Sequence, residues 1–345
     1  MNKRMLLCIG IIVLFLSVSI APITQGVLNE TSNSPITKGT TLYVGGTGEG
    51  NYTMIQDAIN DAYDGDTVFV YDEGSPYYEN LKVTKSINLI GEDKNTTVVD
   101  GHQYSDVIFV SHSANGVTIK GFTIQNGGDD KWGDAGIDLR SNLNIIKSNI
   151  ITLNDKHGIY FISSNHNIII SNTFSDNLYG IYGESDYTII QENYVTNCYR
   201  GISLKSSLHW TIINNTIINN DNAGIYLFGG KGCSCHNITI IGNIISNNEI
   251  GIQSNEPGIN TIIRNDIRNN QLGVGMYDSG SIKENNFIGN TRPAVFCSLS
   301  NWRGNYWDKP RLLPKPIFGT IFIFIPWVQF NWHPAKEPYD IEGVI

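Results

Sequence analysis

The sequence predicts an all-β protein, a right-handed parallel β-helix of about 22 residues per coil, because two motifs recur in phase along it. A Gly followed by Ile or Val recurs with spacings of 22, 22, 21, 23, 27 and 22 residues, and an Asn recurs with spacings of 23, 21, 22, 28, 22 and 21. Both series lengthen at the same place, so a short insertion lies there. A period shared by two motifs is typical of a solenoid whose repeats stack on one another. The series are Gly136, Gly158, Gly180, Gly201, Gly224, Gly251 and Gly273, and Asn149, Asn172, Asn193, Asn215, Asn243, Asn265 and Asn286.

The segments between these motifs are short and β-branched, as in 167–170, 210–213 and 237–241. They end in Asn, Ser, Gly or Asp, which favours strands of a few residues joined by tight turns. No window carries a sustained helical stripe, which disfavours leucine-rich or helical repeats. We expect Ile, Val and Leu to stack inside, and the repeated Asn to tolerate a left-handed backbone and to hydrogen-bond along the stack. Parallel crossovers are almost always right-handed.

The start of the solenoid is predicted to be covered by a helix over 54–62. Thr53-Met-Ile-Gln56 fits a capping box, and apolar residues follow at helical spacing from Ile55 to Ala62. Strand 67–70 follows, and then less regular coils that contain 87–90, 107–110 and 117–119.

At the other end the repeats stop near Asn305. The apolar segment 317–330, interrupted by Gly319 and Pro326, predicts a strand hairpin over the last coil, with a membrane-associating segment as the alternative.

The chain divides into five regions. Residues 1–21 indicate an export signal or an uncleaved membrane anchor, because Lys3 and Arg4 precede an apolar run. Residues 22–40, rich in Thr, Ser, Asn and Pro, are typical of a flexible tether. We expect an N-terminal cap with early coils in 41–115, regular repeats in 116–300 and a C-terminal cap in 301–345. The protein is thus expected to be exported, to the extracellular space, cell surface or periplasm, with a membrane tether at either end as an option.

Net charge excludes one class of partner and suggests one modification. The charge is −9 and basic residues do not cluster, which argues against binding nucleic acid. Sequons predict a surface glycoprotein. They lie at Asn29, Asn51, Asn95, Asn214 and Asn237.

Several motifs resemble a known group of proteins. The run from Tyr43 through Asn51-Tyr-Thr-Met-Ile-Gln-Asp-Ala-Ile59, Asp64-Gly-Asp-Thr67 and Ser86-Ile-Asn-Leu-Ile-Gly91 resembles the opening of pectin-lyase-like right-handed β-helix proteins. The Asn-rich repeats are similar to the NosD-like and carbohydrate-binding/sugar-hydrolase β-helix families, and Asn305-Tyr-Trp-Asp308 resembles their end. The resemblance covers about 41–308. It implies the fold and, for NosD-like proteins, a role in assembling the copper centre of nitrous oxide reductase. The catalytic motifs of pectinesterases and polygalacturonases do not match, so no catalytic residue is carried over.

Aligned repeats predict one outward face that binds a polysaccharide or another glycan of the cell envelope. Residues two and four positions after each Gly, and the residue just before it, should point outward. Sugar rings stack on aromatic side chains, and polar groups bind their hydroxyls. Residues 127–133, which include Asp129, Asp130 and Trp132, would wall one end. The candidates are Asp138, Arg140, Asp155, His157, Tyr160, Tyr182, Glu184, Arg200 and Tyr226.

Two other interpretations of this face stay open. One is a polysaccharide lyase, hydrolase or esterase that uses Asp138 with Asp155 for acid–base work. The other is a solvated sheet surface on which Tyr is simply a good strand former.

No cofactor is expected, with copper or zinc as the alternative. His166, Asp186, His209 and His236 each precede an Ile-rich strand one coil apart, and imidazole and thiolate suit these metals. The alternative is a polar turn. The metal candidates are Asp186, His209, Cys233, Cys235 and His236. Cys198 and Cys297 lie at other positions in the coil, so no long-range disulfide is expected, and Cys297 should point inward.

Overall fold

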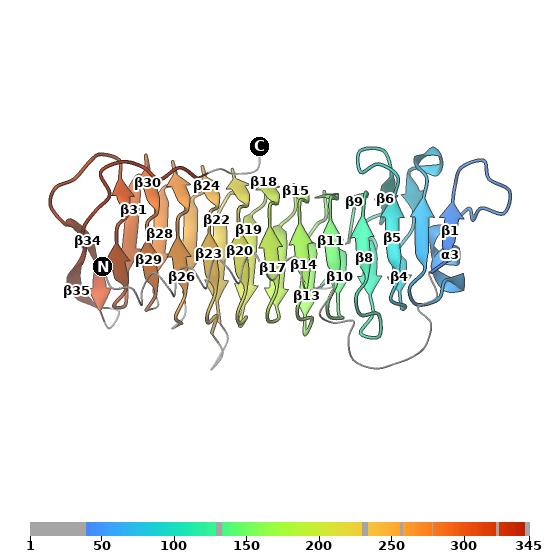
Figure 1. The fold of residues 1–345 in the computed structure, drawn as a ribbon, viewed down its shortest axis with the longest axis horizontal. Coiled ribbons are helices and arrows are strands. Elements are labelled where there is room, and N and C mark those ends of the chain that lie inside the picture. The colour runs from blue at the N-terminus through green and yellow to red at the C-terminus, as the bar shows by residue number, and fades with distance from the viewer. Residues whose placement is uncertain are drawn as a thin grey trace, which may run out of the picture. The chain divides into compact units, whose positions relative to one another are not determined.

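Residues 39–128, 133–229, 234–255, 258–277, 279–321 and 324–341 are described by the computed structural model. Within the unit Gly39–Ile345 they form a right-handed parallel β-helix of three sheets along a common axis (Figure 1), which confirms the predicted fold class. In this part of the chain no helix is long and apolar enough to cross a membrane. The predicted signal segment, nearly all of the tether, Asn29, residues 129–132 and Cys233 lie outside the described residues.

Two of the sheets are made of very short strands, three or four residues in most coils. The 12-stranded sheet consists of β1 (Thr41–Val44), β2 (Thr67–Val70), β5 (Asn88–Gly91), β8 (Thr118–Lys120), β11 (Ile145–Lys147), β14 (Ile168–Ile170), β17 (Ile189–Gln191), β20 (Thr211–Ile213), β23 (Thr239–Ile241), β26 (Thr261–Ile263), β29 (Ser281–Lys283) and β32 (Asn301–Arg303). The 11-stranded sheet consists of β3 (Tyr77–Tyr78), β6 (Val98–Asp100), β9 (Thr123–Gln125), β12 (Ile150–Thr152), β15 (Thr173–Ser175), β18 (Tyr194–Thr196), β21 (Thr216–Ile218), β24 (Ile244–Ser246), β27 (Asp266–Arg268), β30 (Asn286–Ile288) and β33 (Tyr306–Trp307).

The third sheet has longer strands and carries the predicted outward face. It consists of β4 (Leu81–Val83), β7 (Ile108–Val110), β10 (Ala135–Leu139), β13 (His157–Ile162), β16 (Tyr179–Glu184), β19 (Arg200–Lys205), β22 (Ala223–Phe228), β25 (Ile250–Ser254), β28 (Leu272–Met276) and β31 (Arg292–Phe296). Outside the three sheets lie helix α3 (Ile55–Asp61), the short 3₁₀ turn η1 (Asp72–Gly74) and the hairpin β34 (Lys315–Ile321) with β35 (Ile325–Asn331).

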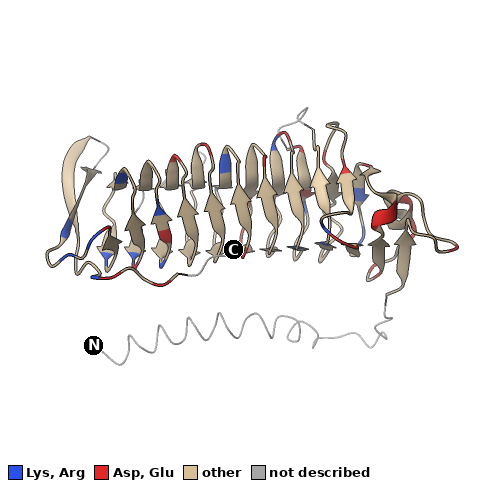
Figure 2. Cartoon of the chain, turned by 90° about the horizontal axis from the view of Figure 1, so that it is seen from above, with Lys and Arg blue, Asp and Glu red and all other residues tan. Residues whose placement is uncertain are grey.

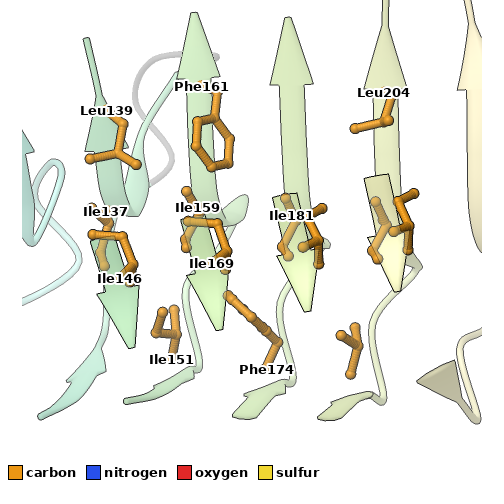
Figure 3. Packing of buried hydrophobic residues seen from close by; sticks show 14 of the residues in the cluster. Ile137, Leu139, Ile146, Ile151, Ile159, Phe161, Ile169, Phe174, Ile181 and Leu204 are labelled. Atoms are coloured by element: carbon orange, nitrogen blue, oxygen red, sulfur yellow. The ribbon is translucent and has the colours of Figure 1, made fainter. Parts of the chain in front are cut away.

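The interior is a set of stacked aliphatic columns. Ile137 pairs in register with Ile159, and the same column continues through Ile181, all of them fully buried. Figure 3 shows these side chains pointing inward together with their neighbours from the other two sheets. The register confirms the alignment on the Gly-Ile motif, which the column follows through Ile202, Ile225, Ile252 and Val274.

The Gly of the motif allows consecutive coils to approach closely. A Cβ atom at Gly158 would lie 2.5 Å from the carbonyl oxygen of Gly180, closer than real Cβ contacts come. The same holds at each repeat from Gly136 to Gly251, with distances of 2.5–2.8 Å to the next coil. The periodic Gly therefore follows from coil spacing.

A ladder of buried Asn side chains closes the corner between the 12- and 11-stranded sheets. The Oδ1 atom of Asn193 accepts from the backbone N–H and the Nδ2 of Asn172, and its own Nδ2 donates to Asn215 and to two carbonyls. The backbone N–H donates to the next Oδ1 over 2.8–3.3 Å along the whole ladder. Its members are Asn149, Asn172, Asn193, Asn215, Asn243, Asn265, Asn285, Asn305 and Asn331.

This ladder corrects two predictions. Asn285, not Asn286, continues the series, because Asn286 begins β30. The left-handed backbone belongs to the residue before each ladder Asn, for example Ser171 at φ 56° and Glu192 at φ 52°, and not to the Asn itself. The left-handed residue turns the chain, and the Asn that follows can then point inward and bond to the next coil.

A second ladder closes the corner between the 11- and 10-stranded sheets. It runs from Asn154 to Asn177 and resumes from Asn220 through Asn248, Asn270 and Asn290. Between its two parts Cys198 takes the place of an Asn, and its N–H donates to Asn220. Burial raises the pKa of the Cys198 thiol to about 12, so the thiol stays neutral in this position.

The predicted capping box of the N-terminal helix is wrong. Helix α3 begins at Ile55, its N-cap is Met54, and no side chain of the cap bonds to it. Instead the carboxylate of Glu79 accepts from the N–H groups of Ile55 and Gln56 at 2.8 and 2.9 Å. An ionised acceptor from a later coil thus replaces a local hydroxyl, which suits the positive end of a helix.

A C-terminal strand hairpin is present where it was predicted, and its role as a cap stays a prediction. Strands β34 and β35 pair antiparallel from Lys315 with Asn331 to Ile321 with Ile325, and they contact β31 and β32. Cys297 is half-buried beside this hairpin, where its sulfur accepts from Thr320 at 3.3 Å, so the prediction that it points into the core is wrong.

Replacing Asn193 with Ala should lower the free energy of unfolding by about 3 kcal/mol or more, because several buried polar groups would lose their partners. Chemical denaturation followed by circular dichroism measures the change. Asn301→Ala, at an exposed side chain, is the control and should stay close to the wild type. Equal midpoints for the two variants would contradict the ladder's role.

Glu79→Ala should lower stability by about 1–2 kcal/mol, whereas Thr53→Ala should change it by less than about 0.5 kcal/mol. The reason is that Glu79 supplies both acceptors of the helix start. Hydrogen exchange of the amides of residues 55–61 localises the effect. A larger loss of stability in the Thr53 variant than in the Glu79 variant would support the local capping box instead.

Candidate functional site

The predicted outward columns lie side by side on the outer face of the 10-stranded sheet. One column pairs in register from Asp138 through Tyr160 and Tyr182 to Ser203, Tyr226 and Gln253. His157 also lies on this face, since its ring is 4.9 Å from that of Tyr160. The sequence alignment therefore predicted the register of this column correctly.

The predicted exposure of this face is wrong at its centre. Asp138 is 2% exposed, His157 0%, Tyr160 6% and Tyr182 4%. Tyr160 and Tyr182 form with Ala135 a small cluster separate from the main core, and the partly buried Ile162, Tyr179 and Phe228 pack against it. These residues point away from the interior, but neighbouring side chains cover them, so the pair Tyr160 and Tyr182 cannot serve as an open platform for a sugar.

His157 lies at the centre of this cluster. Its ring centroid is 5.3 Å from Tyr179 in a stacked arrangement and 5.1 Å from Tyr182 in an edge arrangement. Its Nδ1 lies 3.2 Å from the carbonyl oxygen of Asp134. Burial lowers the pKa of His157 to about 4, so the ring is neutral at physiological pH and acts as an aromatic packing group.

Two carboxylates border the cluster. Asp138 forms a two-point ion pair with Arg140, with both distances at 2.7 Å. Burial raises the pKa of Asp138 to about 6 in spite of this partner. Burial, with the charge of Asp138 as the next cause, raises the pKa of Asp106 to about 7, although Asp106 accepts from the N–H of Ala135 at 2.9 Å. Shifts of this kind mark functional sites as well as structural ion-pair networks.

The remaining polar candidates on the face each have a side-chain partner. Glu184 and Lys205 form an ion pair at 3.0 Å. The guanidinium of Arg200 lies 3.7 Å from the ring centroid of Tyr226 and donates to Asn222 at 2.8 Å. At the end of the face near residues 127–133, Gly133 lies against Tyr160 and Arg140, since a Cβ atom there would come within 3.0 and 3.3 Å of them.

Asp155 does not lie on this face. It lines a groove of about 470 Å³ along the neighbouring corner, between the 11- and 10-stranded sheets. A second stretch of about 460 Å³ continues from the shared Asp221. We call this whole feature the corner groove. Its described lining residues are Gln103, Asn126, Leu153, Asn154, Asp155, Asp176, Asn177, Leu178, Asn197, Tyr199, Asn219, Asn220, Asp221, Asn247, Asn248, Glu249, Asn269 and Gln271.

The corner turn explains the shape of the groove. Each coil places a left-handed residue, such as Asp176 or Asn197, on one side, and the residue two positions later, such as Leu178 or Tyr199, on the other. The buried Asn of the second ladder lies between them and forms the floor. The groove is therefore a periodic consequence of the same turn that closes each coil.

Tyr199 joins the groove to the cluster on the sheet face. Its side chain is 42% exposed, and its ring meets Tyr179 edge-on at 6.4 Å while Arg200 lies 5.4 Å from its centroid. Tyr179 in turn stacks on His157. The exposed ring of Tyr199 is thereby held by a packed aromatic support.

The groove was missed from the sequence although a signal was present. Asn154, Asn177, Asn220, Asn248 and Asn270 repeat with nearly the same period as the first Asn series. The residues before and after each of them could have been aligned as the two walls. Of the predicted glycan-binding candidates, only Asp155 lines the groove, and the others were taken from the Gly-Ile strand and its ends.

The predicted metal column is out of register. His166, Tyr187 and His209 share one column of left-handed residues, and their rings stack at 4.9 and 4.6 Å. Asp186 and His236 belong to the adjacent column, in which Leu208 lies between them and forms a β-bridge with each. The carboxylate of Asp186 accepts from the N–H of Leu208 at 2.8 Å.

Cysteine and histidine near the insertion also point apart. Cys235 is 2% exposed in the core, with its sulfur 3.3 Å from the carbonyl oxygen of Leu204, whereas the half-buried His236 lies 3.2 Å from the hydroxyl of Ser234. Among the residues that the structure describes, no group of three or more His, Cys, Asp or Glu is arranged to hold a metal ion.

The described sequons differ in accessibility. Asn95 and Asn237 are exposed, Asn214 is half-buried, and Asn51 donates to the carbonyl oxygen of Gly45 at 2.6 Å. Glycosylation at these sites stays a prediction.

One protein family matches most of the chain. The model of the family described as "Periplasmic copper-binding protein (NosD)" matches residues 59–237 and 232–313. No curated protein sequence matches the chain.

Solved structures share the fold at low sequence identity. A Dettilon tailspike protein is 16% identical with a TM-score of 0.56, over 73% of this chain and 56% of that one, so the chain spans little more than half of the tailspike. The A-module of a mannuronan C-5 epimerase from Azotobacter vinelandii is 13% identical with a TM-score of 0.52, over 83% of this chain and 95% of that one. A lacto-N-biosidase from Eubacterium ramulus is 12% identical with a TM-score of 0.57, over 87% of this chain and 68% of that one.

The raised pKa values of the border carboxylates predict a pH effect on stability. A folded state that raises the pKa of Asp106 to about 7 binds a proton more tightly than the unfolded chain, so this group lowers the free energy of unfolding as the pH rises from about 4 to about 7. Asp106→Asn removes the group but keeps an acceptor for Ala135. The variant should therefore gain stability relative to the wild type between pH 4 and pH 8, measured by thermal unfolding. A difference that does not change with pH would contradict the raised pKa of Asp106.

Proposed function

This chain belongs to the NosD family, described as periplasmic copper-binding proteins, and from that premise we propose that it is an exported protein of the cell envelope that binds glycans without chemically altering them. The proposed site is the corner groove with Tyr199 at its centre. The observation that carries the proposal is the mixed lining of this groove.

The groove offers both kinds of contact that a sugar needs. Its apolar surface comes from Tyr199 and from the exposed side chains of Leu153 and Leu178. Carboxylates and amides alternate with these along the same walls, as Asp155 and Asp176 do. Carbohydrate sites combine apolar area for affinity with a few polar groups that fix orientation, so this composition supports glycan binding.

The periodicity of the groove suits an extended chain. Successive coils of a β-helix lie about 4.8 Å apart, close to the length of one sugar unit, so equivalent wall residues can contact successive units. The two stretches meet at Asp221, which gives a continuous path over several coils. The sheet face beside the groove supports Tyr199. It does not offer a contact surface for the glycan, because the centre of the sheet face is buried.

Two of the structurally similar proteins are carbohydrate-active by name, the epimerase and the lacto-N-biosidase. They support the idea that this fold can present a groove to a glycan. Their identities of 13% and 12% carry no residue assignment to this chain.

An enzyme, a lyase, hydrolase or esterase, is the second candidate, and the raised pKa values of Asp106 and Asp138 favour it. Asp138, however, is buried and paired with Arg140. Asp155, the other predicted acid–base residue, lines the corner groove and not this face. We therefore place binding before catalysis.

The family's copper is not accommodated by the described residues. Cys235 faces the core, His236 lies beside Ser234, and His209 is stacked on Tyr187. We assign no step that involves copper to these side chains.

Tyr199→Ala should weaken binding of the purified protein to its glycan by roughly tenfold, about 1.4 kcal/mol, because it removes the only described tyrosine that lines the groove. A glycan array identifies the ligand, and titration calorimetry then measures the affinity. Tyr277→Ala is the matched control, since Tyr277 is 43% exposed and does not line the groove.

An unchanged affinity of the Tyr199 variant would reject the groove as the site. If the wild-type protein shortened a polysaccharide and the Asp138→Asn variant did not, the proposed function would change from binding to catalysis.

A further inference from the structure

Resting on the proposed function, we infer that the corner groove selects uncharged polysaccharides and rejects polyuronates, the acidic sugars that carry a carboxylate on each unit. The inference comes from the sign and position of the charges around the groove. It names a ligand class that neither the fold nor the family determines.

The charges that line the groove are all negative. Asp155, Asp176, Asp221 and Glu249 are exposed along its two stretches. Among its described lining residues there is no Lys, Arg or His. The other lining groups are amides and apolar side chains, which carry no charge.

Three cations of the sheet face are engaged by other side chains and do not line the groove, although Arg200 lies 5.4 Å from the ring centroid of Tyr199. Arg200 lies over Tyr226 and donates to Asn222, Lys205 pairs with Glu184, and Arg140 pairs with Asp138. Most of the strand segments drawn in Figure 2 are tan, so they consist of residues that are neither basic nor acidic. The net charge of −9 adds to the same field.

Hydrogen bonding, like charge, favours a neutral sugar over a uronate in this groove. An ionised carboxylate only accepts hydrogen bonds, so Asp155, Asp176 and Asp221 need donors from the ligand. A neutral sugar offers hydroxyl donors on every unit. A uronate carries a carboxylate in place of the hydroxymethyl group of a neutral sugar, and this carboxylate can only accept hydrogen bonds. In a bound polyuronate, such a carboxylate would face the wall carboxylates once per coil.

Repulsion of this kind operates at the distances of the groove. With the coils about 4.8 Å apart, a bound polyuronate would keep several of its charges within one Debye length, about 8–10 Å at physiological salt, of the wall carboxylates. Like charges brought together at an interface cost free energy and so disfavour a partner of the same charge. The acidic walls are thus expected to set selectivity, and Tyr199 to set affinity.

The test compares neutral and acidic polysaccharides of similar length on the same protein. Galactomannan and dextran serve as neutral probes, and polygalacturonate and alginate as acidic probes, at 20 and 300 mM NaCl with EDTA present. The wild type should bind a neutral probe at least roughly tenfold more tightly than either acidic probe at low salt, and the gap should narrow at high salt.

A charge-removing variant tests the cause. The triple variant Asp155→Asn, Asp176→Asn and Asp221→Asn keeps the size of three exposed wall residues and one of the two acceptor oxygens of each, and removes their charge. At low salt the variant should have a ratio of affinity for polygalacturonate to affinity for the neutral probe that is at least roughly tenfold higher than the ratio of the wild type. Circular dichroism and the unfolding midpoint check that the variant is folded.

The outcomes separate this inference from the proposed function. Preference of the wild type for polyuronates, or a triple variant with unchanged selectivity, overturns the inference and leaves glycan binding intact. Binding of polygalacturonate that appears only when EDTA is replaced by calcium also overturns it, since a bridging cation would then define the ligand. If no polysaccharide binds, or if Tyr199→Ala binds as well as the wild type, the groove itself is rejected.

Discussion

The hydrogen bonding of buried polar groups at the corners is the constraint on which the rest of this structure depends. A coil of about 22 residues must turn three times between its sheets, and each turn buries N–H and C=O groups that water cannot reach. Asn side chains meet this requirement, as Asn193 does by accepting from one coil and donating to the next. The aliphatic columns can stack because the corners hold the coils in register. The Gly-Ile strand then brings the coils to contact distance, where a Cβ at Gly158 would clash.

The candidate site follows from the same corner. A left-handed residue and an inward Asn leave the neighbouring side chains on two outward rows, so a groove arises wherever the turn repeats. The residue type on those rows varies from coil to coil, as at Tyr199 and Asp221, and this variation gives the groove its chemistry without disturbing the floor. At Cys198 the floor itself changes, and a buried neutral thiol takes the place of an amide beside Tyr199.

The sheet face shows how one column can be structural and appear functional. Asp138, His157 and Tyr160 belong to the residue types that bind or transform sugars, yet they are almost fully buried. His157 is kept neutral by burial, and Asp138 is held by Arg140. The cluster supports Tyr179 and through it Tyr199. A small aromatic core on the outside of the sheet is therefore consistent with a binding protein whose contact surface lies beside it.

The sequence by itself determined the fold and the register of the columns, because a period of 22 residues leaves one way to align Ile137, Ile159 and Ile181. It also determined which side chains leave the core, since alternation along a strand is local. Only the tertiary structure decided which of these are exposed, because the cover over Tyr160 and Tyr182 comes from other coils and other strands. Only the tertiary structure showed that the acceptor at the helix start is Glu79 and not Thr53, because Glu79 lies 24 residues after the first helical residue. It alone separated Asp155 from the sheet face, because the corner directs that side chain into the groove.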